Sequence, residues 1–414
     1  HLFRKARIGA PFLLGGLLPT LLEYAPDGAT PADQPYRGRR LLTFSDSRQG
    51  TARLAAKLQQ DAERTKARGL IYHHVLKAMT ETVAPELAEI QNLIGGYENI
   101  LATPGIPEVA RAPIVQMLHD ARMRLEDATR PAPMSFQQLQ AAIAQEGQEF
   151  RWILQTYQGY SREVFGGHEG ASNLAGMLVV RELGRRPKRQ NNLETMGMIA
   201  VRYPRLDLLN TAPMDWTSRG FTLPEWKDFL KVAVDHFVRG GGSLDIPDLW
   251  RNWIGIRFPR NWIVPPNQDE VARGQRRWPS ARRSRDRSAL VRLLAHLLRV
   301  DVDTDPGQDA VDSLLISAWE QVKTMLSLTA SGYILRLQDL AFSPVAHAWV
   351  CPVTRRFLDT TVRGVTPYLP RIMREEIAVC ERREIPVYDL PFGGETDGVL
   401  RIVSNTVKMT HGIN

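Results

Sequence analysis

Arginine side chains gather in one short segment of the chain. Seven arginines and one aspartate lie within residues 273–287, a surplus of six positive charges, and the whole protein has a net charge of +8. Guanidinium groups with an aromatic ring among them could neutralise phosphates and stack on a base. The candidates are Arg276, Arg277, Arg282, Arg283 and Arg285, with Trp278 between them. The alternative is a solvated, mobile loop whose charges bind nothing specific.

The second candidate is the sequence "TFSDSRQG" at residues 43–50, which follows the apolar pair Leu41 and Leu42. This pattern predicts a strand that ends abruptly and a helix that begins at once. Small polar side chains at a helix N-terminus favour an anion, because the free N–H groups and the helix dipole point at it. Phosphate contacts are therefore expected from Ser45, Ser47, Arg48 and Gln49. The alternative is simple helix capping by Asp46 with Gln49, and the two can coexist.

Other groups of ligand-type residues do not fit a site. The aspartates of residues 301–312 have calcium-loop spacing, but Pro306 stands where that loop needs glycine. We expect Asp305 to cap the next helix and Pro306 to be its first residue. His347, Cys351 and Cys380 lack the paired CxxC units of a zinc site, so packing roles are expected. His73 and His74 are expected to be helix-surface and core residues rather than ligands.

The bulk composition indicates a folded protein of two or three domains. The chain has 414 residues, 43% of them hydrophobic and 24% charged. Two cysteines are too few for a disulfide framework and fit a reducing compartment, so a cytoplasmic location is expected. The apolar run at residues 8–22 is too short to cross a membrane, and no membrane association is expected. The first residue is His1, and we expect the chain to be a piece of a longer protein.

The elements around the candidate sites can be read from apolar spacing. A helix is expected from Asp46, with a break allowed at Gly69. Apolar seams at residues 87–101 and 114–125 predict two antiparallel helices joined by a Pro/Gly turn. Ser135 and Gln138 have capping-box spacing. A strand is expected within residues 195–204, an amphipathic helix at residues 223–242, and β-hairpins from residue 332 onwards.

Residues 39–76, "RRLLTFSDSRQGTARLAAKLQQDAERTKARGLIYHHVL", resemble motif IV of superfamily 2 DEAD/DEAH-box helicases, where this motif opens the second RecA-like domain. The resemblance is strongest to a subgroup of large bacterial helicases, several of them found in anti-phage defence systems. Residues 183–204, "LGRRPKRQNNLETMGMIAVRYP", and residues 349–370, "WVCPVTRRFLDTTVRGVTPYLP", also resemble segments of that subgroup. The subgroup carries a long insertion after motif IV.

The resemblance implies an α/β opening at residues 1–80, which would be a partial RecA-like second helicase lobe. A predominantly α-helical insertion at 81–330 and a β-hairpin-rich part at 331–414 would follow. It places Thr43 and Ser45 at the strand end facing the nucleic-acid backbone, with Ser47, Arg48 and Gln49 at the start of the helix. The implied parent protein uses ATP and Mg²⁺, acts on DNA rather than RNA, and could have a protein partner in a defence complex.

The chain departs from the helicase pattern in the parts that handle ATP. The sequence contains no G-x-x-x-x-G-K-[ST] phosphate loop and no Q-x-x-G-R-x-x-R arginine motif. The letters "DEVA" at residues 269–272 follow "VPPNQ", which cannot be a central strand because proline donates no ladder hydrogen bond. We therefore expect this chain to grip nucleic acid without hydrolysing ATP by itself. The alternative from another class is a non-catalytic basic scaffold that binds nucleic acid or a protein.

Overall fold

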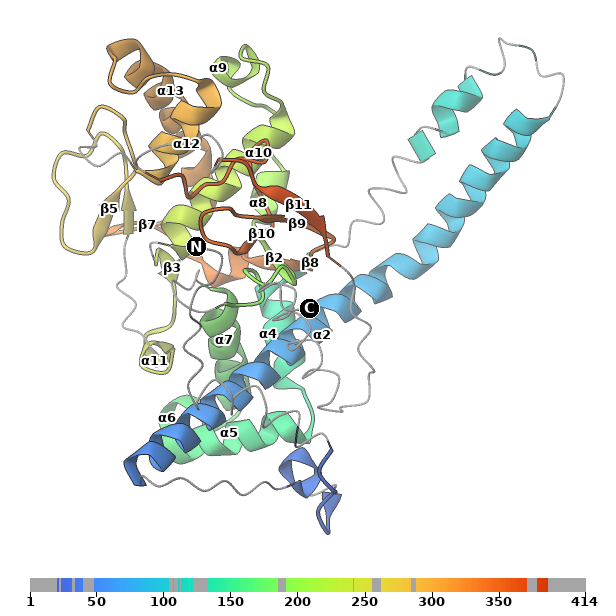
Figure 1. Ribbon diagram of the computed structural model, residues 1–414, viewed down its shortest axis with the longest axis vertical. Helices are drawn as coiled ribbons and strands as arrows, with labels where there is room; N and C mark the ends of the chain where they lie inside the picture. Colours follow the sequence, from blue (N-terminus) through green and yellow to red (C-terminus); the bar gives the residue numbers. More distant parts are fainter. Residues whose placement is uncertain are drawn as a thin grey trace, which may run out of the picture.

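The computed structural model combines helices with three small sheets, a mixed α/β architecture (Figure 1). It describes residues 21, 24–31, 34–39, 48–103, 107, 111, 113–118, 120–121, 133–184, 191–240, 242–254, 262–283, 288–370 and 378–385. Side chains are not described for residues 35–36, 48–62, 79–88 and 148–149. No helix in these ranges is long and apolar enough to cross a membrane.

The longest element is helix α2, Arg48–Ala102, with 55 residues. Its middle part, residues 67–76, packs into the core, and its last part extends away from the rest of the protein (Figure 1). The helix runs through Gly69 without the break that the sequence allowed, because Arg68, Leu70 and Ile71 on either side are buried. It also runs through Pro85, which has no N–H to donate to the preceding turn.

The distal part of α2 agrees with the predicted apolar seam. The seam residues Ile90, Ile94, Tyr97 and Leu101 are half-buried, whereas Leu93 and Ile100 beside them are exposed. Residues 113–118 are also helical, and there the seam positions are again more covered than their neighbours. The predicted Leu125 lies outside the described residues.

The other helices are all shorter than α2. They are η2 (Pro35–Gly38), α4 (Phe136–Ala144), α5 (Gln148–Tyr160), α6 (Arg162–Phe165), α7 (Gly170–Leu183), α8 (Pro204–Asp207), α9 (Met214–Thr217), α10 (Leu223–Val234), the π-helix η3 (Asp235–Arg239), α11 (Asp248–Arg251), α12 (Ala289–Leu298), α13 (Asp305–Val322), η4 (Lys323–Met325) and η5 (Leu337–Asp339).

Local sequence signals account for several helix starts. The predicted capping box is confirmed at α4, where the Ser135 hydroxyl accepts from the Gln138 N–H and the Gln138 side chain accepts from the Ser135 N–H. Helix α10 begins with a second capping box, between Thr222 and Glu225. Helix α13 is capped one residue earlier than predicted. The Thr304 hydroxyl, and not Asp305, accepts the capping hydrogen bond.

Eleven strands are present in the described part of the chain. They are β1 (Met134–Ser135), β2 (Ile199–Arg202), β3 (Leu244–Asp245), β4 (Trp262–Val264), β5 (Gln275–Arg277), β6 (Ser327–Thr329), β7 (Gly332–Arg336), β8 (Ala341–Pro344), β9 (His347–Val350), β10 (Phe357–Leu358) and β11 (Glu381–Glu384). The predicted strand within residues 195–204 is thus confirmed as β2, and the region after residue 332 is rich in strands.

The strands form three sheets. Strand β8 lies between β1 and β2 in an antiparallel sheet, and β9 lies between β10 and β11 in another. The third sheet is mixed, with the order β3-β7-β4-β5 and β6 paired to β7. Strands β7 and β8 therefore pair with strands from residues before 330. One continuous cluster of buried apolar side chains extends from Ala67 to Ala378.

Candidate functional site

The predicted phosphate-binding turn lies at the start of α2. Thr43, Ser45 and Ser47 are outside the described residues. Arg48 and Gln49 are the first two residues of the helix, although their side chains are not described. The helix predicted from Asp46 is confirmed from Arg48 onward, and residues 46 and 47 lie outside the described residues.

The arginine segment forms strand β5 and the turn that follows it. Two of its arginines, Arg282 and Arg283, form ion pairs with aspartates. Arg282 Nη2 lies 2.6 Å from Asp309 Oδ1, and Arg283 Nη1 lies 3.1 Å from Asp269 Oδ1. Both guanidinium groups remain about half exposed, 50% and 44%. Exposed ion pairs of this kind contribute little stability, so a phosphate could replace the aspartates. Arg285 lies outside the described residues.

Other side chains of the segment turn inward. The Arg276 guanidinium lies over the ring of Phe237, 5.5 Å from its centroid, and burial lowers its pKa. Arg277 Nη2 donates to the carbonyl oxygen of Asp269 at 2.5 Å. The Trp278 ring is fully buried, and its Nε1 donates to the carbonyl oxygen of Leu315 at 2.8 Å. The expectation that Trp278 offers a stacking face is therefore wrong, because the core covers the ring.

The rejected metal patterns have structural roles. Asp312 accepts hydrogen bonds from the Ser280 hydroxyl and from the Ala281 N–H, so it holds the turn after β5. The letters "DEVA" fall in an exposed loop before β5. His347 lies at the far end of β9 from Cys351, with Glu384 as its cross-strand partner.

The two cysteines come together although 28 residues separate them in the sequence. Glu381 faces Val350 in the β9–β11 pair, and one further step of this antiparallel register places Cys380 opposite Cys351. Both thiols are buried and reduced. The Thr354 N–H donates to Cys351 Sγ at 3.3 Å, and the Thr366 hydroxyl lies 3.0 Å from the same sulfur. The predicted packing role agrees with this burial.

A buried ionic network lies where α10 passes into the π-helix η3. Arg239 Nη1 and Nη2 contact the two carboxylate oxygens of Glu194 at 2.6 and 2.5 Å. Arg239 Nη1 also lies 3.0 Å from Asp235 Oδ1. Lys231 Nζ joins Asp235 to Asp359, at 3.0 and 2.9 Å. The network therefore cross-links the loop before β2, the α10–η3 helix and the segment after β10.

Burial shapes the protonation of this region. The Tyr203 hydroxyl donates to Asp235 Oδ1 at 2.7 Å, and burial together with this carboxylate raises the pKa of Tyr203. The Arg239 side chain is completely buried, but its carboxylate partners keep its pKa raised. On the same helix, burial raises the pKa of Asp228 to about 6. Buried charged side chains need such partners, because a buried ion without a partner destabilises the folded protein far more than a paired one.

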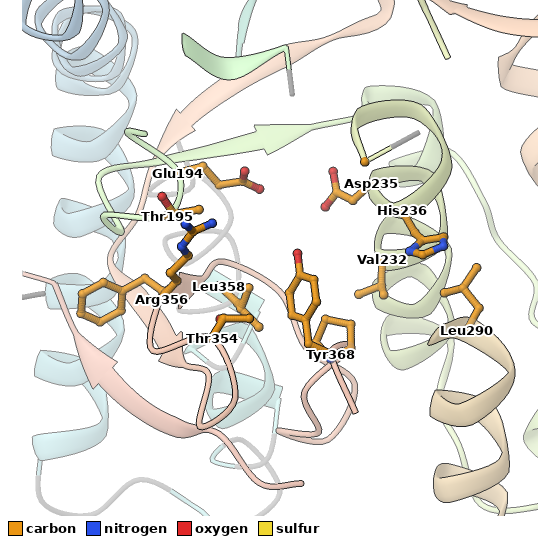
Figure 2. Close-up of a pocket in the computed structure, with 13 residues that line it drawn as sticks. Glu194, Thr195, Val232, Asp235, His236, Leu290, Thr354, Arg356, Leu358 and Tyr368 are labelled. Carbon is orange, nitrogen blue, oxygen red and sulfur yellow. The ribbon is translucent and has the colours of Figure 1, made fainter. Parts of the chain in front are cut away.

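A cavity of about 310 Å³ adjoins the network. Figure 2 shows the Glu194 and Asp235 carboxylates and the Tyr368 hydroxyl directed toward the same space. The apolar part of its wall consists of Val232, Leu290, Phe357, Leu358 and Pro367. This volume is at the lower end of the range for small-molecule sites.

The three carboxylates of the network do not fit a metal ion. Ligand oxygens of Glu194, Asp235 and Asp359 lie within 4.8 Å of one another, a spacing that could suit a cation. However, Arg239 and Lys231 already contact these oxygens. A cation would have to displace two buried positive charges, so we assign the network a structural role.

Sequence reasoning did not identify the network, although part of its signal was visible. Lys231, Asp235 and Arg239 recur every four residues with alternating charge, which places them on one helix face. Most residues around them are apolar and buried, so these charges stand on the core side of the helix. Glu194 and Asp359 could not be found in this way, because their position depends on tertiary packing.

Comparison with known proteins adds no assignment. No family model, no curated protein and no solved structure matches this chain.

Proposed function

We propose that this chain is part of an ATP-dependent nucleic-acid helicase or translocase and that it grips the phosphate backbone. The observation that carries this proposal is that the chain is helical from Arg48 onward, which follows the small polar residues of "TFSDS" in the sequence. In the resemblance to motif IV, this turn ends a strand of a RecA-like lobe and faces the nucleic-acid backbone. Free N–H groups at the helix start and a guanidinium suit a phosphate.

In this proposal, other parts of the parent protein hydrolyse ATP. The sequence has no phosphate-loop lysine motif, so ATP and Mg²⁺ would bind elsewhere. This chain would supply grip through Thr43, Ser45, Ser47, Arg48 and Gln49, with further contacts from the half-exposed Arg282 and Arg283. DNA is the proposed substrate and anti-phage defence the proposed setting, both by way of the resemblance.

The test is binding of labelled single-stranded and duplex DNA, followed by fluorescence anisotropy at several salt concentrations. Arg48→Ala should weaken binding several-fold and leave the melting temperature unchanged, because a phosphate contact does not stabilise the free protein. Arg151→Ala is the matched control, since Arg151 is an exposed arginine on α5.

Two results would count against the proposal. If Arg48→Ala lowers the melting temperature but not the affinity, residue 48 belongs to helix capping. If binding survives Arg48→Ala and depends instead on the arginines of residues 276–283, the non-catalytic basic scaffold is favoured.

A further inference from the structure

We propose that His73, His74 and Glu146 form a binding site for a divalent transition-metal ion of the Zn²⁺ class. The two histidines are consecutive residues of α2, and Glu146 lies in the turn between α4 and α5. One ligand atom from each residue lies within 4.8 Å of the others. Two imidazoles and one carboxylate are a set that suits Zn²⁺, Fe²⁺, Co²⁺ or Ni²⁺.

The closest pair of donors already has nearly the spacing that a metal requires. His74 Nε2 lies 2.8 Å from Glu146 Oε1. Two donors that each sit about 2.0–2.2 Å from one tetrahedral ion are roughly 3.3–3.6 Å apart, so this pair needs to open by less than about 1 Å. The His73 and His74 rings stand edge to face, with their centroids 5.1 Å apart. Only small side-chain rotations are therefore needed to bring all three donors to one ion.

The ring nitrogen of His74 provides a second, independent observation. His74 Nε2 is shielded from solvent, and Glu146 Oε1 lies 2.8 Å from it without the alignment of a well-formed hydrogen bond. A buried polar atom without a well-aligned hydrogen bond is destabilising. A metal ion would give this lone pair a partner.

The charge around the site is compatible with a bound cation. Metal ions bind the neutral form of an imidazole ring and the ionised form of a carboxylate. Lys66 and Lys77 are near enough to act on His73, which makes the Glu146 charge essential for binding.

The site differs from the acidic network beside the cavity. There, buried cations contact the carboxylate oxygens. Here the side chains of His74 and Glu146 retain 13% and 29% exposure, which leaves a path for the ion and room for a water ligand. A bound ion would fasten α2 to the α4–α5 turn at the end of its buried stretch.

Untagged protein stripped with a chelator and dialysed against buffer is the starting material, because a histidine tag would bind the same ions. Zn²⁺ alone is titrated by calorimetry, and the bound metal is counted by mass spectrometry after dialysis. We expect one equivalent of Zn²⁺ and a rise in melting temperature, since an ion that binds only the folded state stabilises it. Co²⁺ should give the absorption of a site with nitrogen and oxygen ligands.

Two variants and a matched control decide the outcome. Glu146→Gln and His73→Ala should each weaken Zn²⁺ binding by at least about tenfold and abolish the thermal shift. The control is His168→Ala, because His168 Nε2 also lies near a carboxylate, 3.4 Å from Glu169 Oε1, but is 93% exposed. Equal binding by Glu146→Gln and the wild type, or less than half an equivalent in the wild type, would overturn the proposal.

Discussion

Arg239 is the side chain on which the buried ionic network depends. Its guanidinium satisfies Glu194 and Asp235 together, and a further hydrogen bond goes from its Nε to the carbonyl oxygen of Leu183 at 3.1 Å. All three side chains are almost without solvent contact. Loss of the cation therefore leaves two carboxylates in the core with one partner fewer.

Arg239→Met should lower the free energy of unfolding by about 3–5 kcal/mol, because it leaves buried charges uncompensated. Urea unfolding followed by circular dichroism measures this loss. The double variant Arg239→Met/Glu194→Met should be less destabilised than the single one, since it removes a carboxylate as well. Arg151→Met on the exposed face of α5 should stay within about 0.5 kcal/mol. A loss below 1 kcal/mol for Arg239→Met would contradict a buried network.

Asp228 predicts a specific pH dependence of stability. Burial raises its pKa in the folded protein from 3.8 to about 6, so the folded state holds this proton more tightly than the unfolded state does. The resulting stabilisation is complete below about pH 4 and is lost as the pH rises through 6. Relative to Asp228→Asn, the wild type should therefore lose up to about 3 kcal/mol between pH 4 and pH 7. Urea unfolding of both proteins at matched pH values measures the difference between their free energies of unfolding. If this difference does not change with pH, the pKa of Asp228 is not raised and the prediction is wrong.

Helix α7 illustrates packing at the scale of the element. A Cβ atom on Gly176 would lie 2.3 Å from Cη2 of Trp250 and 2.8 Å from Nε2 of Gln140. The Trp250 ring is held in place by a hydrogen bond from its Nε1 to Asn173 Oδ1 at 3.2 Å. Glycine is therefore required here by close approach and not by backbone conformation.

Gly176→Ala should destabilise the protein by about 1–3 kcal/mol through overpacking, although alanine is the better helix former. Gly159→Ala in α5 is the control, because a Cβ there meets no atom within 4 Å. It should be neutral or stabilising by up to about 1 kcal/mol. Chemical unfolding measures the change in the free energy of unfolding for both variants. A loss for Gly176→Ala together with no loss for Gly159→Ala would support the tight α7–Trp250 contact. Stabilisation by both substitutions would contradict it.

The elements that the sequence predicted well are those with local signals. The capping box at Ser135, the strand β2 and the helix α10 each depend on residues a few positions apart. Gly69 was misleading because Arg68 Nε contacts Glu182 Oε1 of α7 at 2.6 Å, and such packing outweighs a glycine penalty of about 1 kcal/mol. The pairing of β8 with β1, more than 200 positions earlier, has no local signal at all.

In the candidate site too, the features with a local sequence signal could be predicted and those that depend on distant residues could not. The arginine cluster was evident from composition, but its partners Asp269 and Asp309 come from two other segments of the surface. The burial of Trp278 depends on α13, which is remote in sequence. Charges that a sequence shows as surplus can therefore be partly neutralised in the folded protein.

At the scale of the whole molecule, the charge balance of the arginine segment can be tested through salt dependence. Replacing Arg282 and Arg283 with alanine should flatten the salt dependence of DNA binding by up to about 0.9 slope units per lost duplex contact. Asp309→Asn should strengthen binding, because it removes the closer of the two carboxylates that pair with Arg282, the other being Asp305 at 3.9 Å. Anisotropy titrations between about 50 and 200 mM salt measure both effects. If neither substitution changes the slope or the affinity, the segment is a solvated surface.

Helix α2 has a mechanical consequence. Leu76 is the last of its residues known to be buried, and the helix continues to Ala102. At 1.5 Å per residue, this leaves a rod of roughly 40 Å anchored at one end. A tilt of about 10° at the anchor would carry the tip about 7 Å. A slight rearrangement around residues 67–76 is therefore magnified into a displacement larger than one helical turn at the far end.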